Sequence, residues 1–140
     1  MVLEEAMVAG ADTPRRVVLI DDEPMVLAAI ASFLALETQC EVTSFCCPRE
    51  ALKHLASCGA DVVVADLSIR GLNGAAFIDE VKRLDRSIRL VLLSGAIDDG
   101  WREAMLRCGL DGCLEKPWCN DELRAQIMNG SDAGAGEDVP

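Results

Sequence analysis

A single carboxylate, Asp66, comes directly after four apolar residues (62–65) of this 140-residue chain. Such a continuous β-branched run predicts a strand that is buried on both faces, as in a parallel sheet. In open α/β sheets, ligands bind at the carboxyl ends of the strands. Asp66 is therefore placed to do chemistry rather than to solvate a surface. The alternative is a turn aspartate that caps the following helix.

Three other predicted strands also run into polar or charged residues. Together with Asp66 they would bring a carboxylate cluster, a hydroxyl and an ammonium to one edge of the sheet: Asp21, Asp22 and Glu23 after the first strand, Ser94 after the fourth and Lys116 after the fifth. Carboxylates with few other ligands suit Mg²⁺, which keeps waters and shares its shell with phosphate oxygens. A hydroxyl and a lysine hold phosphoryl oxygens and offset their charge. The set predicts phosphoryl transfer to a carboxylate nucleophile, while helix capping is the alternative for Asp21 and Asp22.

Strand and helix patterns alternate five times along the chain. We expect strands at 16–21, 41–45, 62–66, 88–93 and 112–114, and helices at 25–37, 48–55, 76–84, 98–108 and from Asn120 or Asp121 to Met128. Such alternation predicts a parallel sheet with helices on both faces. Right-handed crossovers then leave few possible topologies.

Four short motifs resemble the receiver domain of bacterial two-component response regulators, over about residues 15–129. These are Ile20–Glu23, Val64–Gly74, Leu93–Gly95 and Leu114–Pro117, and the spacing between them also fits. The resemblance implies one doubly wound (βα)5 domain with a five-stranded parallel sheet in the flavodoxin-like order 2-1-3-4-5. It also implies a signalling phosphoacceptor, which is not an enzyme beyond its own Mg²⁺-dependent phosphorylation and dephosphorylation.

The resemblance also assigns roles to individual residues. It implies that the phosphoacceptor is Asp66, that Mg²⁺ or Mn²⁺ is bound by Asp21, Asp22, Asp66 and the backbone carbonyl of Ser68, and that the phosphoryl group is contacted by Ser94 and Lys116. The Lys116–Pro117 bond is cis in many relatives, which would aim the lysine. The implied donor is a sensor histidine kinase or a phosphotransfer protein.

Several positions depart from the family pattern. Arg70 stands where proline is common, and it is either a donor or phosphoryl contact or a solvated loop cation. Cys113 occupies the switch position, where an aromatic ring is usual, so the usual coupling between a hydroxyl and a ring is in doubt. Ser68 and Ala96, at positions that tune hydrolysis of the acyl phosphate, are both small and uncharged. Trp118 directly after Pro117, with Asn120–Leu123 beyond, is similar to the sequence of receivers attached to HD-GYP phosphodiesterases. The alternative is that Trp118 simply packs against the last helix.

Two other classes of protein compete with this interpretation. Enzymes of the haloacid-dehalogenase type also form an aspartyl phosphate, but they place a second aspartate where this chain has Ser68. A degenerate receiver would bind partners without phosphorylation, and Cys113 keeps that hypothesis open. Partner binding that needs no Mg²⁺ and survives Asp66→Asn would favour it.

The net charge of −11 argues against nucleic acid as a direct partner. Residues 1–14 are expected to be a flexible acidic leader, and residues 130–140 a disordered acidic tail or linker stub. The sequence contains no run of about 18 apolar residues, so we expect no membrane insertion. Its first residues lack the basic flank of a signal peptide. We therefore expect a cytoplasmic protein, either a stand-alone regulator or a receiver cut from a longer protein such as an HD-GYP-type effector.

Seven cysteines and one histidine are poorly spaced for a zinc site. We expect the cysteines to be buried thiols in a reducing compartment, and His54 to lie at or near the surface.

Phosphorylation would change partner binding or dimerisation at the face formed by the last two helices and the fifth strand. Aliphatic side chains there would serve the contact or, equally, the core: Met105, Leu106, Leu123 and Ile127.

Overall fold

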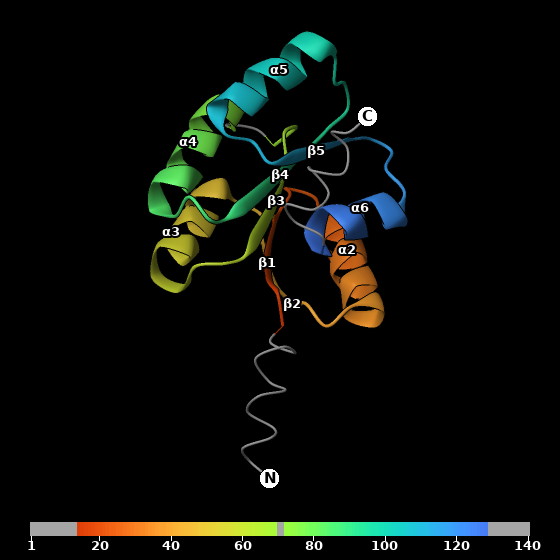
Figure 1. Cartoon of the computed structure of the whole chain (residues 1–140). Coiled ribbons are helices and arrows are strands. Elements are labelled where there is room, and N and C mark those ends of the chain that lie inside the picture. The colour runs from red at the N-terminus through yellow and green to blue at the C-terminus, as the bar shows by residue number, and fades with distance from the viewer. Residues whose placement is uncertain (1–13, 70–71, 129–140) are drawn as a thin grey trace.

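The computed structural model describes residues 14–69 and 72–128 (Figure 1). The strands are β1 Arg16–Ile20, β2 Glu41–Phe45, β3 Val62–Asp66, β4 Arg89–Ser94 and β5 Gly112–Glu115. The helices in the described ranges are α2 Pro24–Glu37, α3 Pro48–Cys58, α4 Gly74–Leu84, α5 Asp99–Cys108 and α6 Asn120–Met128. All neighbouring strands pair in parallel, in the order β2-β1-β3-β4-β5. The predicted fold class and strand order are confirmed.

Helices cover both faces of the sheet. Figure 1 shows α3, α4 and α5 on one side and α2 and α6 on the other. Alternate residues of β3 serve the two layers, since Val63 packs with the α3–α5 side and Val62 and Val64 with the α2 and α6 side. All five residues of β3 are buried. Burial on both faces explains why this strand is a continuous apolar run.

The strand register gathers the polar strand ends at one edge of the sheet. Ile20 pairs with Ala65, so Asp21 and Asp66 follow side by side. Asp66 in turn pairs with Leu93. The backbone N–H of Lys116 donates to the Ser94 carbonyl at 2.8 Å, which sets the last two strand ends together. The convergence expected from the strand pattern is therefore present.

Helix capping explains neither Asp66 nor the Asp21–Asp22 pair. The cap of α4 is Asn73, whose Oδ1 accepts from the Ala76 N–H at 2.9 Å. Helix α2 begins after Glu23, which makes no side-chain cap, with Pro24 in the first turn. The carboxylates of Asp21 and Asp66 are thus available for another role.

One local expectation was wrong. The cysteines are not buried: Cys40 and Cys113 are half-buried, while Cys46, Cys47, Cys58, Cys108 and Cys119 are exposed. The exposed ones lie in connections and at helix ends, where a thiol is not drawn into the core. Of the four aliphatic residues considered for an interface, Leu123 and Ile127 are fully buried, and Met105 packs against the core. Leu106 is 50% exposed and is the one available for contact.

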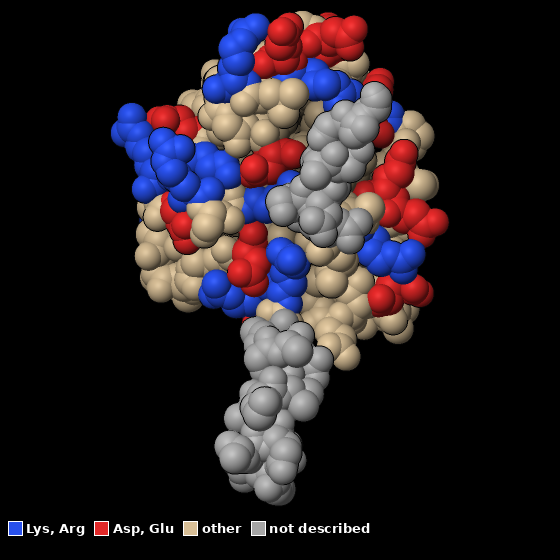
Figure 2. All heavy atoms as spheres, viewed as in Figure 1, with Lys and Arg blue, Asp and Glu red and all other residues tan. Residues whose placement is uncertain are grey.

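The surface carries mixed charge. In the view of Figure 2, each group of Lys and Arg side chains has Asp or Glu side chains beside it. This face is not the continuous basic surface that is typical of nucleic-acid binding. Within the described ranges, no helix is long and apolar enough to cross a membrane.

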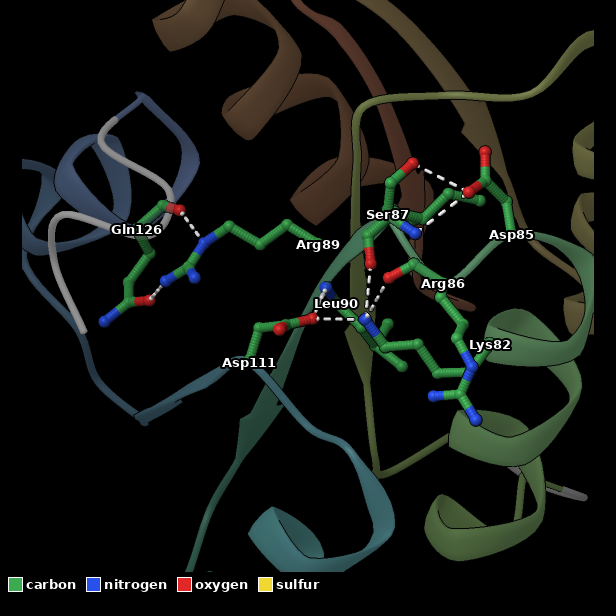
Figure 3. A network of polar contacts seen from close by, with 9 residues as sticks. Lys82, Asp85, Arg86, Ser87, Arg89, Leu90, Asp111 and Gln126 are labelled. Carbon is green, nitrogen blue, oxygen red and sulfur yellow. Dashed lines mark hydrogen bonds and ion pairs between the residues drawn. The ribbon is translucent and has the colours of Figure 1, made fainter. Parts of the chain in front are cut away.

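A polar network around Lys82 ties α4 to the amino-terminal end of β4 (Figure 3). The Nζ atom donates to the Ile88 carbonyl and to Asp111 Oδ2, both at 2.6 Å, and to the Arg86 carbonyl at 3.4 Å. Asp111 Oδ2 also accepts from the Leu90 N–H at 2.8 Å. One ammonium thus holds a helix end, a strand and the segment before β5 together.

Replacing Lys82 with methionine is expected to lower the free energy of unfolding by about 1.5–3 kcal/mol, because three acceptors lose a mostly buried charged donor. Arg83→Met is the matched control. Its pair with Asp79 is exposed on the same helix, so we expect a change within about 0.5 kcal/mol. Urea denaturation of both variants measures the difference, and equal values would mean that the network contributes nothing beyond a surface ion pair.

Candidate functional site

Asp66 is 3% exposed at the carboxyl end of β3. Its Oδ2 accepts a hydrogen bond from Lys116 Nζ at 2.7 Å, and its Oδ1 accepts from the Ser68 N–H at 2.9 Å. Burial by itself raises the pKa of Asp66, but the hydrogen bonds from Lys116 and Ser68 outweigh it and hold the pKa below its ordinary value of 3.8. Asp66 is therefore a buried carboxylate that stays ionised.

In Asp21, which follows the neighbouring strand β1, the effects that raise the pKa outweigh those that lower it. Its side chain is also 3% exposed, and its Oδ1 accepts from the Glu23 N–H at 2.9 Å. Burial first, and then the adjacent Asp66 carboxylate, raise the pKa of Asp21 to about 6. Two buried carboxylates thus lie against each other, and the partly exposed Lys116 is paired with one of them.

This pair fits a divalent cation. Two adjacent buried carboxylates repel each other, and a cation between them would remove that penalty. Within the described ranges, no three His, Cys, Asp or Glu side chains converge on one point. A cation here would therefore complete its shell with backbone carbonyls and water, as Mg²⁺ commonly does. Asp22 is exposed beside Asp21 and does not line the pocket.

A pocket of about 470 Å³ opens over these groups. It is lined by Asp21, Glu23, Val26, Asp66, Ser68, Lys116, Pro117 and Trp118. Sequence reasoning did not assign Val26 or Pro117 to the site. Val26 lies three residues after Glu23 in the first turn of α2, so helical spacing places the two on one face. That spacing was the feature of the sequence from which Val26 could have been assigned to the site.

Ser94 is near the acceptor but faces its own loop. It is 9% exposed, and its hydroxyl donates to the Ala96 carbonyl at 3.1 Å and accepts from the Ala96 N–H at 3.3 Å. Ala96 itself is exposed. Arg70 lies outside the described residues. The Lys116–Pro117 peptide bond is cis, as expected.

Cys113 lies away from the pocket, on the side of the sheet covered by α3–α5. It packs with Trp101 and Met105 against the core on that side. Arg102 Nη1 lies 3.3 Å from its sulfur, and burial raises the pKa of the thiol. Trp118 is half-buried on the opposite side of the sheet, where it packs with the α2 and α6 layer and forms one wall of the pocket.

The sequence matches the response regulator receiver domain over residues 17–128. The chain belongs to this family. Receiver domains are signalling phosphoacceptors of two-component systems; they bind a divalent metal at the phosphorylation site and interact with histidine kinases or phosphotransfer proteins.

Similar proteins come from several bacteria. The transcriptional regulatory protein UhpA of Escherichia coli (strain K12) is 30% identical over 119 residues, which are 84% of this chain and 59% of UhpA. The cyclic di-GMP phosphodiesterase response regulator RpfG of Xanthomonas campestris is 27% identical over 122 residues, 85% of this chain and 32% of RpfG. The chain thus spans less than two thirds of the length of each of these relatives.

A solved structure of a Burkholderia pseudomallei response regulator has the same fold. It contains a phosphorylated aspartic acid and a calcium ion. The TM-score is 0.75 at 22% identity, covering 89% of this chain and 74% of that one. At this identity the likeness extends to the fold, and the roles of individual residues depend on the geometry of this chain.

Proposed function

We propose that Asp66 accepts a phosphoryl group from the phosphohistidine of a sensor histidine kinase or a phosphotransfer protein. The observation that carries the proposal is the state of Asp66 itself. It is buried and ionised, it is oriented by Lys116 and the Ser68 N–H, and it opens onto a pocket. A carboxylate nucleophile has to be ionised and held in a fixed position, and Asp66 meets both conditions.

The transfer is a single displacement at phosphorus. An Asp66 oxygen forms a bond to phosphorus while the bond between phosphorus and the donor nitrogen breaks, and its electron pair returns to the imidazole. Lys116, already at hydrogen-bond distance, offsets charge on the phosphoryl oxygens. Asp21, Asp66 and the Ser68 carbonyl, with Asp22 at the rim, would hold Mg²⁺ or Mn²⁺, which supplies further charge neutralisation.

The switch would begin at Ser94. Its hydroxyl is bonded to Ala96 in this structure, and a new phosphoryl oxygen at Asp66 would compete for it. Cys113 cannot contribute an aromatic ring to the rearrangement. The resulting change would alter a dimer or partner contact at the face formed by α5, β5 and α6, where Leu106 and Met128 are exposed. The proposed domain runs from 15 to 129.

Intact-protein mass spectrometry tests the proposal. The wild-type chain incubated with acetyl phosphate and Mg²⁺ is expected to gain one phosphoryl group, and EDTA should prevent the gain. Asp66→Asn should gain none, while the matched control Asp79→Asn, an exposed aspartate on α4, should behave like wild type. Equal gains in wild type and Asp66→Asn would overturn the assignment of the acceptor. No gain from this donor or from a histidine kinase would favour the phosphorylation-independent receiver.

A further inference from the structure

The side chains that line the acceptor pocket carry an excess of negative charge. Asp21, Glu23 and Asp66 contribute carboxylates, and Lys116 contributes the ammonium. Lys116 is bonded to Asp66 at 2.7 Å. Among the residues that the structure describes, the Glu23 carboxylate has no hydrogen bond or ion pair. Glu23 is therefore the lining charge that no group in the described part of the chain offsets.

The backbone of Glu23 is fixed beside the acceptor. Its N–H donates to Asp21 Oδ1 at 2.9 Å, and its carbonyl accepts from the N–H groups of Val26 and Leu27 at 3.1 and 3.2 Å. The side chain thus leaves the main chain at a defined point, and it lines the pocket together with the buried carboxylates, Val26 and Trp118. The start of α2 fixes where this side chain begins.

The effect of that charge depends on what else the pocket holds. A divalent cation on the buried carboxylates would offset the two negative charges of Asp21 and Asp66. The charges of Glu23, of Asp22 at the rim and of Lys116 would remain, so a neutral residue in place of Glu23 makes the site one charge unit more positive. A more positive site attracts an incoming anion more strongly and raises its rate of association.

We propose that Glu23 is a specificity-determining residue that disfavours small dianionic phosphodonors at Asp66 relative to donors of lower charge. This inference rests on the proposed acceptor role of Asp66. Acetyl phosphate approaches as a dianion; its phosphorus bonds to an Asp66 oxygen while the acyl P–O bond breaks and the electron pair leaves on acetate. Phosphoramidate approaches as a monoanion, and its P–N bond breaks with the pair leaving on ammonia. The Glu23 carboxylate repels the first donor more than the second.

The test compares the two donors in Glu23→Gln, Glu23→Lys and the exposed control Glu50→Gln, which lies on α3 outside the pocket. Phosphorylation is followed by intact mass at Mg²⁺ concentrations that saturate each variant. Coulomb interaction scales with the charge of the donor, so Glu23→Gln should react about three to eight times faster than wild type with acetyl phosphate, and about two to three times faster with phosphoramidate. Glu23→Lys should exceed both values, and high salt should reduce them. Glu50→Gln should match wild type.

A binding readout separates attraction from chemistry. Acetonylphosphonate, a dianion that cannot transfer its phosphoryl group, should compete with acetyl phosphate about three to eight times more strongly in Glu23→Gln than in wild type. Equal acceleration by both donors, or none, would overturn the role of Glu23 while leaving Asp66 as acceptor. A wild-type chain that reacts with neither donor would overturn the proposed function and this inference with it.

Discussion

Replacing Asp21 with asparagine is expected to raise the free energy of unfolding of the metal-free chain by about 2–3 kcal/mol at about pH 7.5. The reason is that folding buries a carboxylate next to another one. Burial and the neighbouring Asp66 raise the pKa of Asp21 from 3.8 to about 6. Each pH unit between these values corresponds to about 1.4 kcal/mol, less some screening at an open pocket. An asparagine keeps the acceptor for the Glu23 N–H without the charge.

The sign of this effect predicts how stability depends on pH. A raised pKa means that folded Asp21 holds its proton more tightly than unfolded Asp21. Its favourable contribution is therefore complete below pH 3.8 and is lost as pH rises through about 6. Asp66 has a lowered pKa, so its contribution is lost only at lower pH. Between about pH 5 and pH 7.5, wild-type stability should fall, and Asp21→Asn should remove that fall.

Chemical denaturation at the two pH values, with and without Mg²⁺, measures both effects. Asp22→Asn is the control, because Asp22 is exposed, and we expect it to change metal-free stability by no more than about 0.5 kcal/mol. A cation that binds only the folded state stabilises it in proportion to its affinity, so Mg²⁺ should stabilise wild type more than Asp21→Asn. A destabilised Asp21→Asn at neutral pH would show that the carboxylate contributes to the fold rather than to the site.

The sheet could be predicted because its central strands are continuous runs of apolar residues. Residues 62–65 are apolar on both faces of β3, and Asp66 interrupts the run at the strand end. Parallel pairing then forces the ends of adjacent strands to one edge. Convergence of Asp21, Asp66 and Lys116 follows from strand position alone, without any knowledge of side-chain conformation.

Features that depend on side-chain direction could not be predicted. Asp21 and Asp22 are adjacent in sequence, but the first is buried and the second exposed, because successive residues at a strand end point in opposite directions. Ser94 is at the expected edge, yet its hydroxyl is bonded to Ala96. Leu123 and Leu106 are both helical leucines, and only packing decides that the first is core and the second is surface.

Replacing Lys116 with methionine is expected to slow phosphorylation of Asp66 by about a hundredfold or more, because one preorganised charged donor is lost from the transferring group. The ammonium is 2.7 Å from Asp66 Oδ2 and 3.5 Å from Ser68 Oγ. Methionine keeps much of the side-chain volume but donates nothing. Intact-mass time courses with acetyl phosphate and Mg²⁺ measure the rate, with Lys53→Met, an exposed lysine on α3, as the control.

Cation binding should change in the opposite direction in the same variant. Among the residues that the structure describes, Lys116 is the cation paired with Asp66, and its removal takes that charge away from Asp21 and Asp66. Two carboxylates without a counter-ion bind a divalent cation more tightly, so Mg²⁺ affinity should rise in Lys116→Met while the rate falls. If both fell together, Lys116 would act by holding the Asp66 carboxylate in position for the cation. If the rate held, the phosphoryl charge would have to be offset by another group. Only opposite changes support a lysine that acts on the transferring phosphoryl group.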